Sequence, residues 1–238
     1  MLARLTQWQE DGAAKPIQLK SRRFCMAIPK LQIEAVEQQA LHAAWQELAG
    51  AETTRWQTLR DAYTEPARHY HNLGHIRALL GWAAENRAHL QDYDAVRFAI
   101  WFHDVVYDTR RGDNEERSAA LAVQALQGIR ISKPVIHAVE TMILATKAHQ
   151  LGELSGDAAW FLDFDLAILG SPPEFYQAYS QAIRREYSWV PGLLFRRKRR
   201  QVLESFLQRE QLFFTAEMRD RLETQARRNL QEELQQLN

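Results

Sequence analysis

The chain is poor in the residues that build disulfides, tight turns and membrane spans. Its 238 residues include one cysteine, Cys25, which rules out an internal disulfide and a zinc site built from several cysteines. Glycine and proline are sparse, so turn signals are few. No apolar run reaches the roughly 18 residues that a membrane helix needs. Residues 1–23 also lack the apolar centre of a secretory signal. We therefore expect a cytoplasmic protein with no membrane contact.

A net charge is absent as well, because 30 lysines and arginines balance 30 aspartates and glutamates. A neutral chain has no overall field that would attract nucleic acid. The run from Arg196 to Arg200 consists of five consecutive cations, which on a helix point to all sides. We interpret it as a solvated helix flank paired with nearby glutamates. One of its arginines could instead face a phosphate pocket. Nucleic-acid binding ranks third, because no nucleic-acid motif accompanies the run.

Apolar residues recur at helical spacing along most of the chain and predict an all-α fold. Residues 1–29 differ from the rest and are expected to form a disordered or loosely docked extension. Residues 30–238 are expected to form one helical domain. Helices are predicted at about 31–50, 53–62, 72–88, 93–106, 115–126, 134–144 and 158–169, followed by two or three long helices within 174–237.

The most informative pair is His103 and Asp104, which large apolar residues flank on both sides. A charged aspartate is rarely buried without a partner, and a divalent cation is one such partner. His71 upstream and Asp165 downstream would complete a set of two imidazoles and two carboxylates on three separated helices. This mixed set suits Mn, Fe, Co, Ni, Zn or Mg. A catalytic site would also keep a position open for water.

Two alternatives stay open at this point. His71 could be an ordinary residue at a helix N-terminus, and His75, four residues later on the same face, could replace it as a ligand or hold it in place. Asp163 and Asp165 lie in a strongly apolar stretch and cannot share one helix face, so at most one of them is expected to be a direct ligand.

The order of these residues resembles the HD superfamily of metal-dependent phosphohydrolases, and one bacterial subfamily of predicted phosphohydrolases in particular. The resemblance covers about residues 31–238 and consists of four blocks in order: Tyr70–His75, Trp101–Asp104, Asn114–Ala119 and Asp163–Gly170. It implies an all-α HD-domain-like core with additional C-terminal helices. It also implies that His71, His103, Asp104 and Asp165 bind the metal.

The resemblance further implies an enzyme that hydrolyses a small phosphorylated metabolite, plausibly a nucleotide. Relatives that bind two metals carry extra histidines between the His-Asp pair and the last aspartate, where His137 and His149 lie here. The role of His149 and the number of metals therefore stay open. The Gly-Tyr-Pro signature of cyclic-dinucleotide phosphodiesterases is missing, so we discount that substrate.

Hydrolysis of a phosphate ester needs a metal-activated water and cations that stabilise the transferred group. Arg68, three residues before His71, and Lys147 are the candidate cations beside the catalytic Asp104. Asp108 is a candidate general acid or base if the helix of Asp104 continues that far, and otherwise a loop residue. Glu115 is the second candidate, or only a first-turn acid that the helix dipole favours.

Two other functional classes compete with the enzyme. A non-catalytic module could keep the metal and sense a nucleotide, and a purely structural metal could join the helices. The apolar residues Leu203, Phe206 and Leu207 could face the core or a second copy of the chain, so a homodimer is a further prediction.

Overall fold

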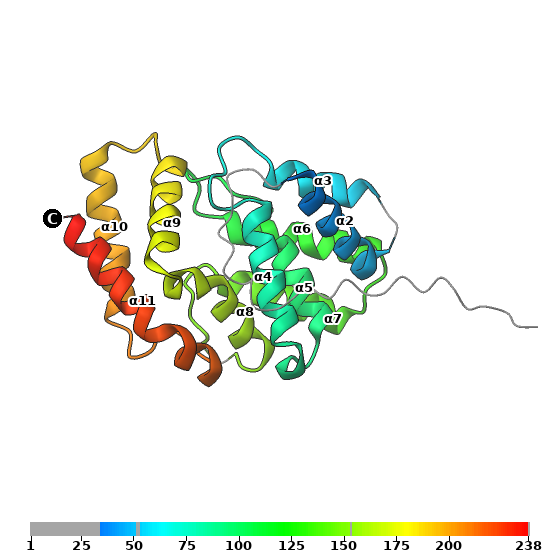
Figure 1. Ribbon diagram of the computed structural model, residues 1–238. Coiled ribbons are helices and arrows are strands. Elements are labelled where there is room, and N and C mark those ends of the chain that lie inside the picture. Colours follow the sequence, from blue (N-terminus) through cyan, green and yellow to red (C-terminus); the bar gives the residue numbers. More distant parts are fainter. Residues whose placement is uncertain (1–33, 51–52, 153, 238) are drawn as a thin grey trace, which may run out of the picture.

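The computed structural model describes residues 34–50, 53–152 and 154–237, and these ranges are helical with no strand among them (Figure 1). The all-α prediction is thus confirmed. The predicted extension at residues 1–29 lies outside the described residues. The α-helices are α2 (Ala35–Ala49), α3 (Thr53–Tyr63), α4 (Leu73–Glu85), α5 (Tyr93–Phe102), α6 (Asn114–Gly128), α7 (Lys133–Ala145), α8 (Asp157–Leu166), α9 (Pro173–Glu186), α10 (Gly192–Leu207) and α11 (Ala216–Gln236), and the 3₁₀ helices are η1 (Arg87–His89) and η2 (Ala167–Gly170).

Helix α5 is the centre of the molecule. Its residues Ala95–Phe102 are all buried, and α4, α6, α7 and α8 pack around it (Figure 1). Trp101 of α5 makes edge-to-face contacts with Trp45 of α2 and Trp56 of α3, with ring centroids 5.7 and 6.0 Å apart. Burial of each such ring contributes roughly 2–3 kcal/mol to stability. The helix that ends at the His-Asp pair is therefore fixed on all sides.

Helix α5 ends at Phe102, four residues before the end that the sequence predicts. The chain turns there because a buried side chain takes over the hydrogen bonds of the next carbonyl groups. Arg68 donates to the carbonyl oxygens of Asp104 at 2.6 Å and Val105 at 2.9 Å. Carbonyl groups at a helix C-terminus need such partners.

Helices α9, α10 and α11 lie together at one side of the molecule (Figure 1). Helix α11 packs against η2, where a Cβ atom on Gly170 would stand 2.8 Å from the carbonyl oxygen of Leu222. The chain entering α11 is held by Asp163, which accepts hydrogen bonds from the backbone of Phe214 and Thr215 at 2.7 and 2.8 Å. Asp163 therefore has a structural role at the start of α11.

The apolar residues weighed for a partner surface pack inside the chain. Leu203 is fully buried, and Phe206 and Leu207 are half-buried against the core. The homodimer stays a prediction. Across the described ranges, no helix combines the length and the apolar character needed to cross a bilayer.

Candidate metal centre

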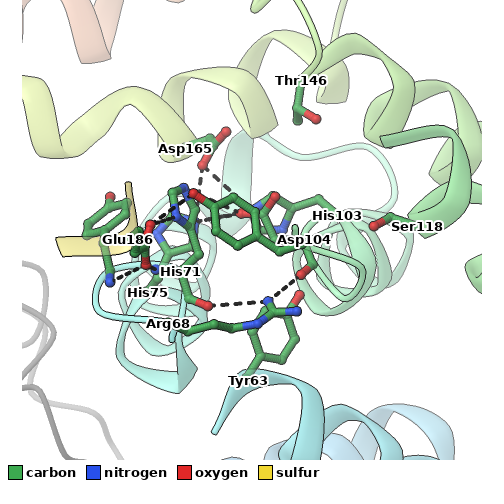
Figure 2. Close-up of polar contacts among 12 residues, drawn as sticks. Tyr63, Arg68, His71, His75, His103, Asp104, Ser118, Thr146, Asp165 and Glu186 are labelled. Carbon is green, nitrogen blue, oxygen red and sulfur yellow. Dashed lines mark hydrogen bonds and ion pairs between the residues drawn. The ribbon is translucent and has the colours of Figure 1, made fainter. Parts of the chain in front are cut away.

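Three separate parts of the fold bring two histidines and two aspartates to one point (Figure 2). His75 lies in the first turn of α4, which Asn72 begins by accepting a hydrogen bond from the Gly74 N–H at 2.8 Å. His103 and Asp104 follow directly after α5, and Asp165 lies near the end of α8. Figure 2 shows Asp165 above the two imidazoles, pointing toward them.

The donor atoms of this group have the spacing that one cation requires. His75 Nε2 lies 3.1 Å from His103 Nε2 and 3.2 Å from Asp165 Oδ1. Asp104 Oδ2 lies 3.1 Å from His103 Nε2 and 3.8 Å from His75 Nε2. Ligand atoms about 2.1 Å from a common ion are roughly 3.0–3.4 Å apart when the bonds diverge at octahedral or tetrahedral angles. His75, His103 and Asp165 form a group that could hold a metal ion, and Asp104 adjoins it through His103.

The ring of His103 is oriented for this purpose. Its Nδ1 lies 3.0 Å from the carbonyl oxygen of Ile100, so Nδ1–H donates there and Nε2 is the nitrogen that faces the group. His75 is 1% exposed, and its Nδ1 has no hydrogen-bond partner in the described part of the chain. Two imidazole nitrogens that face each other at 3.1 Å repel unless a cation or a proton lies between them.

The charged groups of the centre shift one another's pKa values. Burial alone would lower the pKa of His103, but the charges of Asp104 and Asp165 raise it to about 9. Burial likewise opposes ionisation of Asp165, yet hydrogen bonds from His149 and His75 hold its pKa well below the ordinary value. Burial opposes the charge of Asp104 as well, but His103 and His71 lower its pKa, so the ionised aspartates and the protonated His103 stabilise one another.

His71 lies beside this group and not within it. Its Nε2 is 4.0 Å from Asp104 Oδ2, whereas its Nδ1 is 2.7 Å from Glu186 Oε2. Burial lowers the pKa of His71, but the charges of Glu186 and Asp104 outweigh burial and raise it above its ordinary value. Of the two open alternatives for the ligand, the geometry favours His75, and the ligand role implied for His71 stays a prediction that this arrangement does not support.

Glu186, at the end of α9, is the residue that sequence reasoning missed. Its side chain is 0% exposed and accepts hydrogen bonds from the backbone N–H groups of Tyr70 at 2.6 Å and His71 at 3.0 Å. The hydroxyl of Tyr107 donates to it at 2.9 Å. Burial opposes the charge of Glu186, but His71 and these donors lower its pKa to about 2. Nothing in the local sequence pairs this glutamate with a histidine 115 positions earlier.

His149 also reaches the centre. Its Nε2 lies 2.8 Å from the second carboxylate oxygen of Asp165, and its backbone adopts a left-handed φ of 46°. Arg209 fixes this conformation by donating to the carbonyl oxygens of His149 at 2.7 Å and Ala148 at 3.0 Å. His137, in contrast, is 82% exposed and lies outside the site.

The centre opens into a cavity of about 660 Å³. His71, Asp104 and Asp165 lie in its wall, together with tyrosines, apolar side chains, cations and further polar residues that include His149. Two of the candidate catalytic residues, Glu115 and Lys147, line it. Lys147 pairs there with Glu116 and donates to the carbonyl oxygen of Gly112 at 3.0 Å.

The structure does not bring the other two candidates to the cavity. The guanidinium of Arg68 is buried against backbone carbonyl groups, so this residue positions Asp104 and does not face a phosphate. Asp108 is exposed, accepts from the Arg110 N–H at 2.9 Å, and lines a different cleft. The helix continuation on which Asp108 depended is missing because α5 ends at Phe102.

Comparisons with family models, curated proteins and solved structures find no match to this chain.

Proposed function

We propose that this protein is a metal-dependent phosphohydrolase of the HD type that acts on a small phosphorylated molecule of nucleotide size. One observation carries the proposal. His75, His103, Asp104 and Asp165 lie together, and the two aspartates of this group line one cavity with His71, whose Nδ1 lies 2.7 Å from Glu186. A metal with a purely structural role would need only the donor group and no neighbouring proton donor. A histidine held for proton transfer 4.0 Å from one of the carboxylates supports catalysis.

The residues that would hold the metal are His75, His103, Asp104 and Asp165. Two imidazole nitrogens and two carboxylate oxygens suit Mn, Fe, Co, Ni, Zn or Mg. When bound, such a cation supplies hydroxide from water and neutralises charge on the phosphoryl oxygens. His149 supports the set from outside because it fixes the second oxygen of Asp165.

His71 would act as the general acid. Its Nδ1–H donates to Glu186, so the proton on Nε2 is the one available at the cavity. The raised pKa of His71 favours the protonated ring. His71 would give it to the leaving-group oxygen, and Glu186 would stabilise the imidazolium before the transfer. General acids of this kind contribute about 10²–10⁴-fold to a rate.

The cavity sets the size and the charge of the substrate. Its volume of about 660 Å³ lies within the range that holds a drug-sized or nucleotide-sized ligand. Lys147, Lys198 and Arg209 bring positive charge to its wall. Cations next to a metal centre stabilise a phosphoryl group in transfer.

The test is phosphate release from a panel of nucleotides and phosphomonoesters with added Mn²⁺, together with the metal content of the same samples. We expect release by the wild type, and loss of both metal and activity in His75→Ala. His71→Asn should keep its metal and lose about 10²-fold or more in kcat. His137→Ala is the matched control, because this histidine is exposed and outside the site.

Other results would favour a different function or a different assignment of the metal ligands. Metal binding without release from any compound, together with ligand-dependent thermal stabilisation, would favour the sensing module. Unfolding on chelation without any ligand response would favour a structural metal. Full metal content in His75→Ala would show that the donor group is assigned wrongly.

A further inference from the structure

Five cationic side chains line the cavity, and four of them already have an ion-pair or hydrogen-bond partner within the protein. Arg111, Lys147 and Arg199 pair with the carboxylates of Asp113, Glu116 and Glu233, and Arg209 donates to two backbone carbonyl groups. Lys198 makes no hydrogen bond or ion pair with any residue in the described ranges. It is also exposed, so its ammonium group can turn toward a ligand.

One face of α10 forms the cavity wall that carries Lys198. Phe195, Lys198, Val202 and Phe206 recur at helical spacing and all line the cavity. The side chain of Val202 is 43% exposed although it is apolar. The ring of Phe206 lies 6.4 Å from His149 and so near the metal centre. Lys198 is two turns earlier, about 12 Å along the helix axis.

A strip of tyrosines joins the metal centre to this part of α10. The ring of Tyr70 lies 4.9 Å from that of His75, and the ring of Tyr179 lies 4.7 Å from that of Tyr70. The guanidinium of Arg199, the neighbour of Lys198, lies 5.4 Å from the ring of Tyr179. The cavity therefore runs from the metal donors, past two aromatic rings, to a cation with no protein partner in the described chain.

We propose that Lys198 binds a second phosphate of the substrate. The substrate is then a compound with a planar aromatic group and two separate phosphates, such as a nucleoside bisphosphate. This inference rests on the proposed function. The phosphate that is hydrolysed lies at the metal donors, and the planar aromatic group lies along Tyr70 and Tyr179. The second phosphate then reaches Lys198. A substrate with one phosphate would leave the ammonium group unused.

The experiment compares hydrolysis of adenosine 3′,5′-bisphosphate and adenosine 5′-monophosphate by the metal-loaded protein. In Lys198→Gln we expect KM for the bisphosphate to rise about threefold to tenfold, with kcat unchanged. KM for the monophosphate should stay within about twofold. Lys198→Arg should restore the wild-type KM, because it keeps the charge. Arg197→Gln is the matched control, since Arg197 is a cation on the same helix that lines a separate groove.

An equal effect of Lys198→Gln on both nucleotides, or the same effect in Arg197→Gln, would overturn the proposal. Hydrolysis of neither nucleotide with metal bound would count against the proposed function. The role of Lys198 would then be decided by calorimetry with the same two nucleotides. Tighter binding of the bisphosphate that disappears in Lys198→Gln would support the second phosphate site, and equal binding by both proteins would exclude it.

Discussion

The Nδ1 atom of His71 lies 2.7 Å from a carboxylate oxygen of Glu186, although 115 residues separate the two in the chain. His71 precedes α4 and Glu186 ends α9, so the pair exists only once the C-terminal helices have packed against the core. The carboxylate is fully buried and receives two backbone N–H groups besides the imidazole. Such a pair fixes both the tautomer and the charge of the histidine.

We predict that Glu186→Gln lowers kcat about 10–100-fold, because Glu186 raises the pKa of His71 and holds its ring. Activity that needs the protonated imidazole is lost as pH rises through the pKa of His71. Replacement of Glu186 lowers that pKa, so the alkaline limb of the kcat profile should move to lower pH. Metal content should stay at the wild-type level. The measurement is a kcat–pH profile with metal analysis of the same protein.

Glu174→Gln provides the control for this substitution, since Glu174 is exposed in the first turn of the same helix. An alkaline limb that stays in place in Glu186→Gln would remove the proton-transfer role of His71. Loss of metal along with activity would show instead that His71 is a ligand.

Metal affinity should rise with pH. His103 must lose a proton before it can bind a metal, and the charges of the two aspartates raise its pKa to about 9 in the metal-free protein. Below that pH the proton competes with the metal, so affinity should increase about tenfold per pH unit and level off near pH 9. Competition with a chelator at several pH values measures this slope. A flat dependence would mean that His103 is neutral and that its partners are arranged differently.

The sequence was sufficient for the helices and for most of the side chains that meet in the candidate centre, because both depend on local patterns. The run of apolar residues through Trp101 predicted the buried helix, and the His103–Asp104 pair at its end predicted the donor group. The end of that helix could not be predicted, because Arg68 determines it from outside the helix. The choice between His71 and His75 has the same origin: the two lie four residues apart, and contacts with Glu186 and Asp165 from other helices distinguish them.

For Asp163 and Asp165, the geometry of a single helix was sufficient to predict that the two side chains point in different directions. Two residues apart on one helix, they cannot face the same way, and the structure turns one toward the backbone before α11 and the other toward the histidines. The role of Asp108, in contrast, depended on a helix that ends six residues earlier. Patterns within one element were therefore reliable, and contacts between elements were not available from a single sequence.

Gly170→Ala should destabilise the fold. A Cβ atom at this position would lie 2.6 Å from the Cβ of Leu222 and 2.8 Å from its carbonyl oxygen, so α11 would have to move. Such overpacking costs about 1–3 kcal/mol in the free energy of unfolding. Gly112→Ala is the matched control, because a Cβ there meets nothing within 4 Å. Urea unfolding of the two variants decides the point, and equal stability would show that η2 and α11 are packed less closely.

Glu233→Gln should destabilise the protein at neutral pH by about 3 kcal/mol, because it removes one charge of a buried ion pair. Glu233 accepts two hydrogen bonds from Arg199, both at 2.8 Å, which join α10 to α11.

Burial opposes the charge of Glu233, but Arg199 lowers its pKa below the ordinary 4.5. A carboxyl group with a lowered pKa stabilises the fold above its ordinary pKa and loses that contribution as pH falls through its value in the folded state. The difference in unfolding free energy between wild type and Glu233→Gln should therefore be largest near neutral pH and shrink below 4.5. Urea unfolding at several pH values measures it, with the exposed neighbour Glu232→Gln as control. A difference that stays constant with pH would mean that the charge of Glu233 contributes nothing and that only its packing matters.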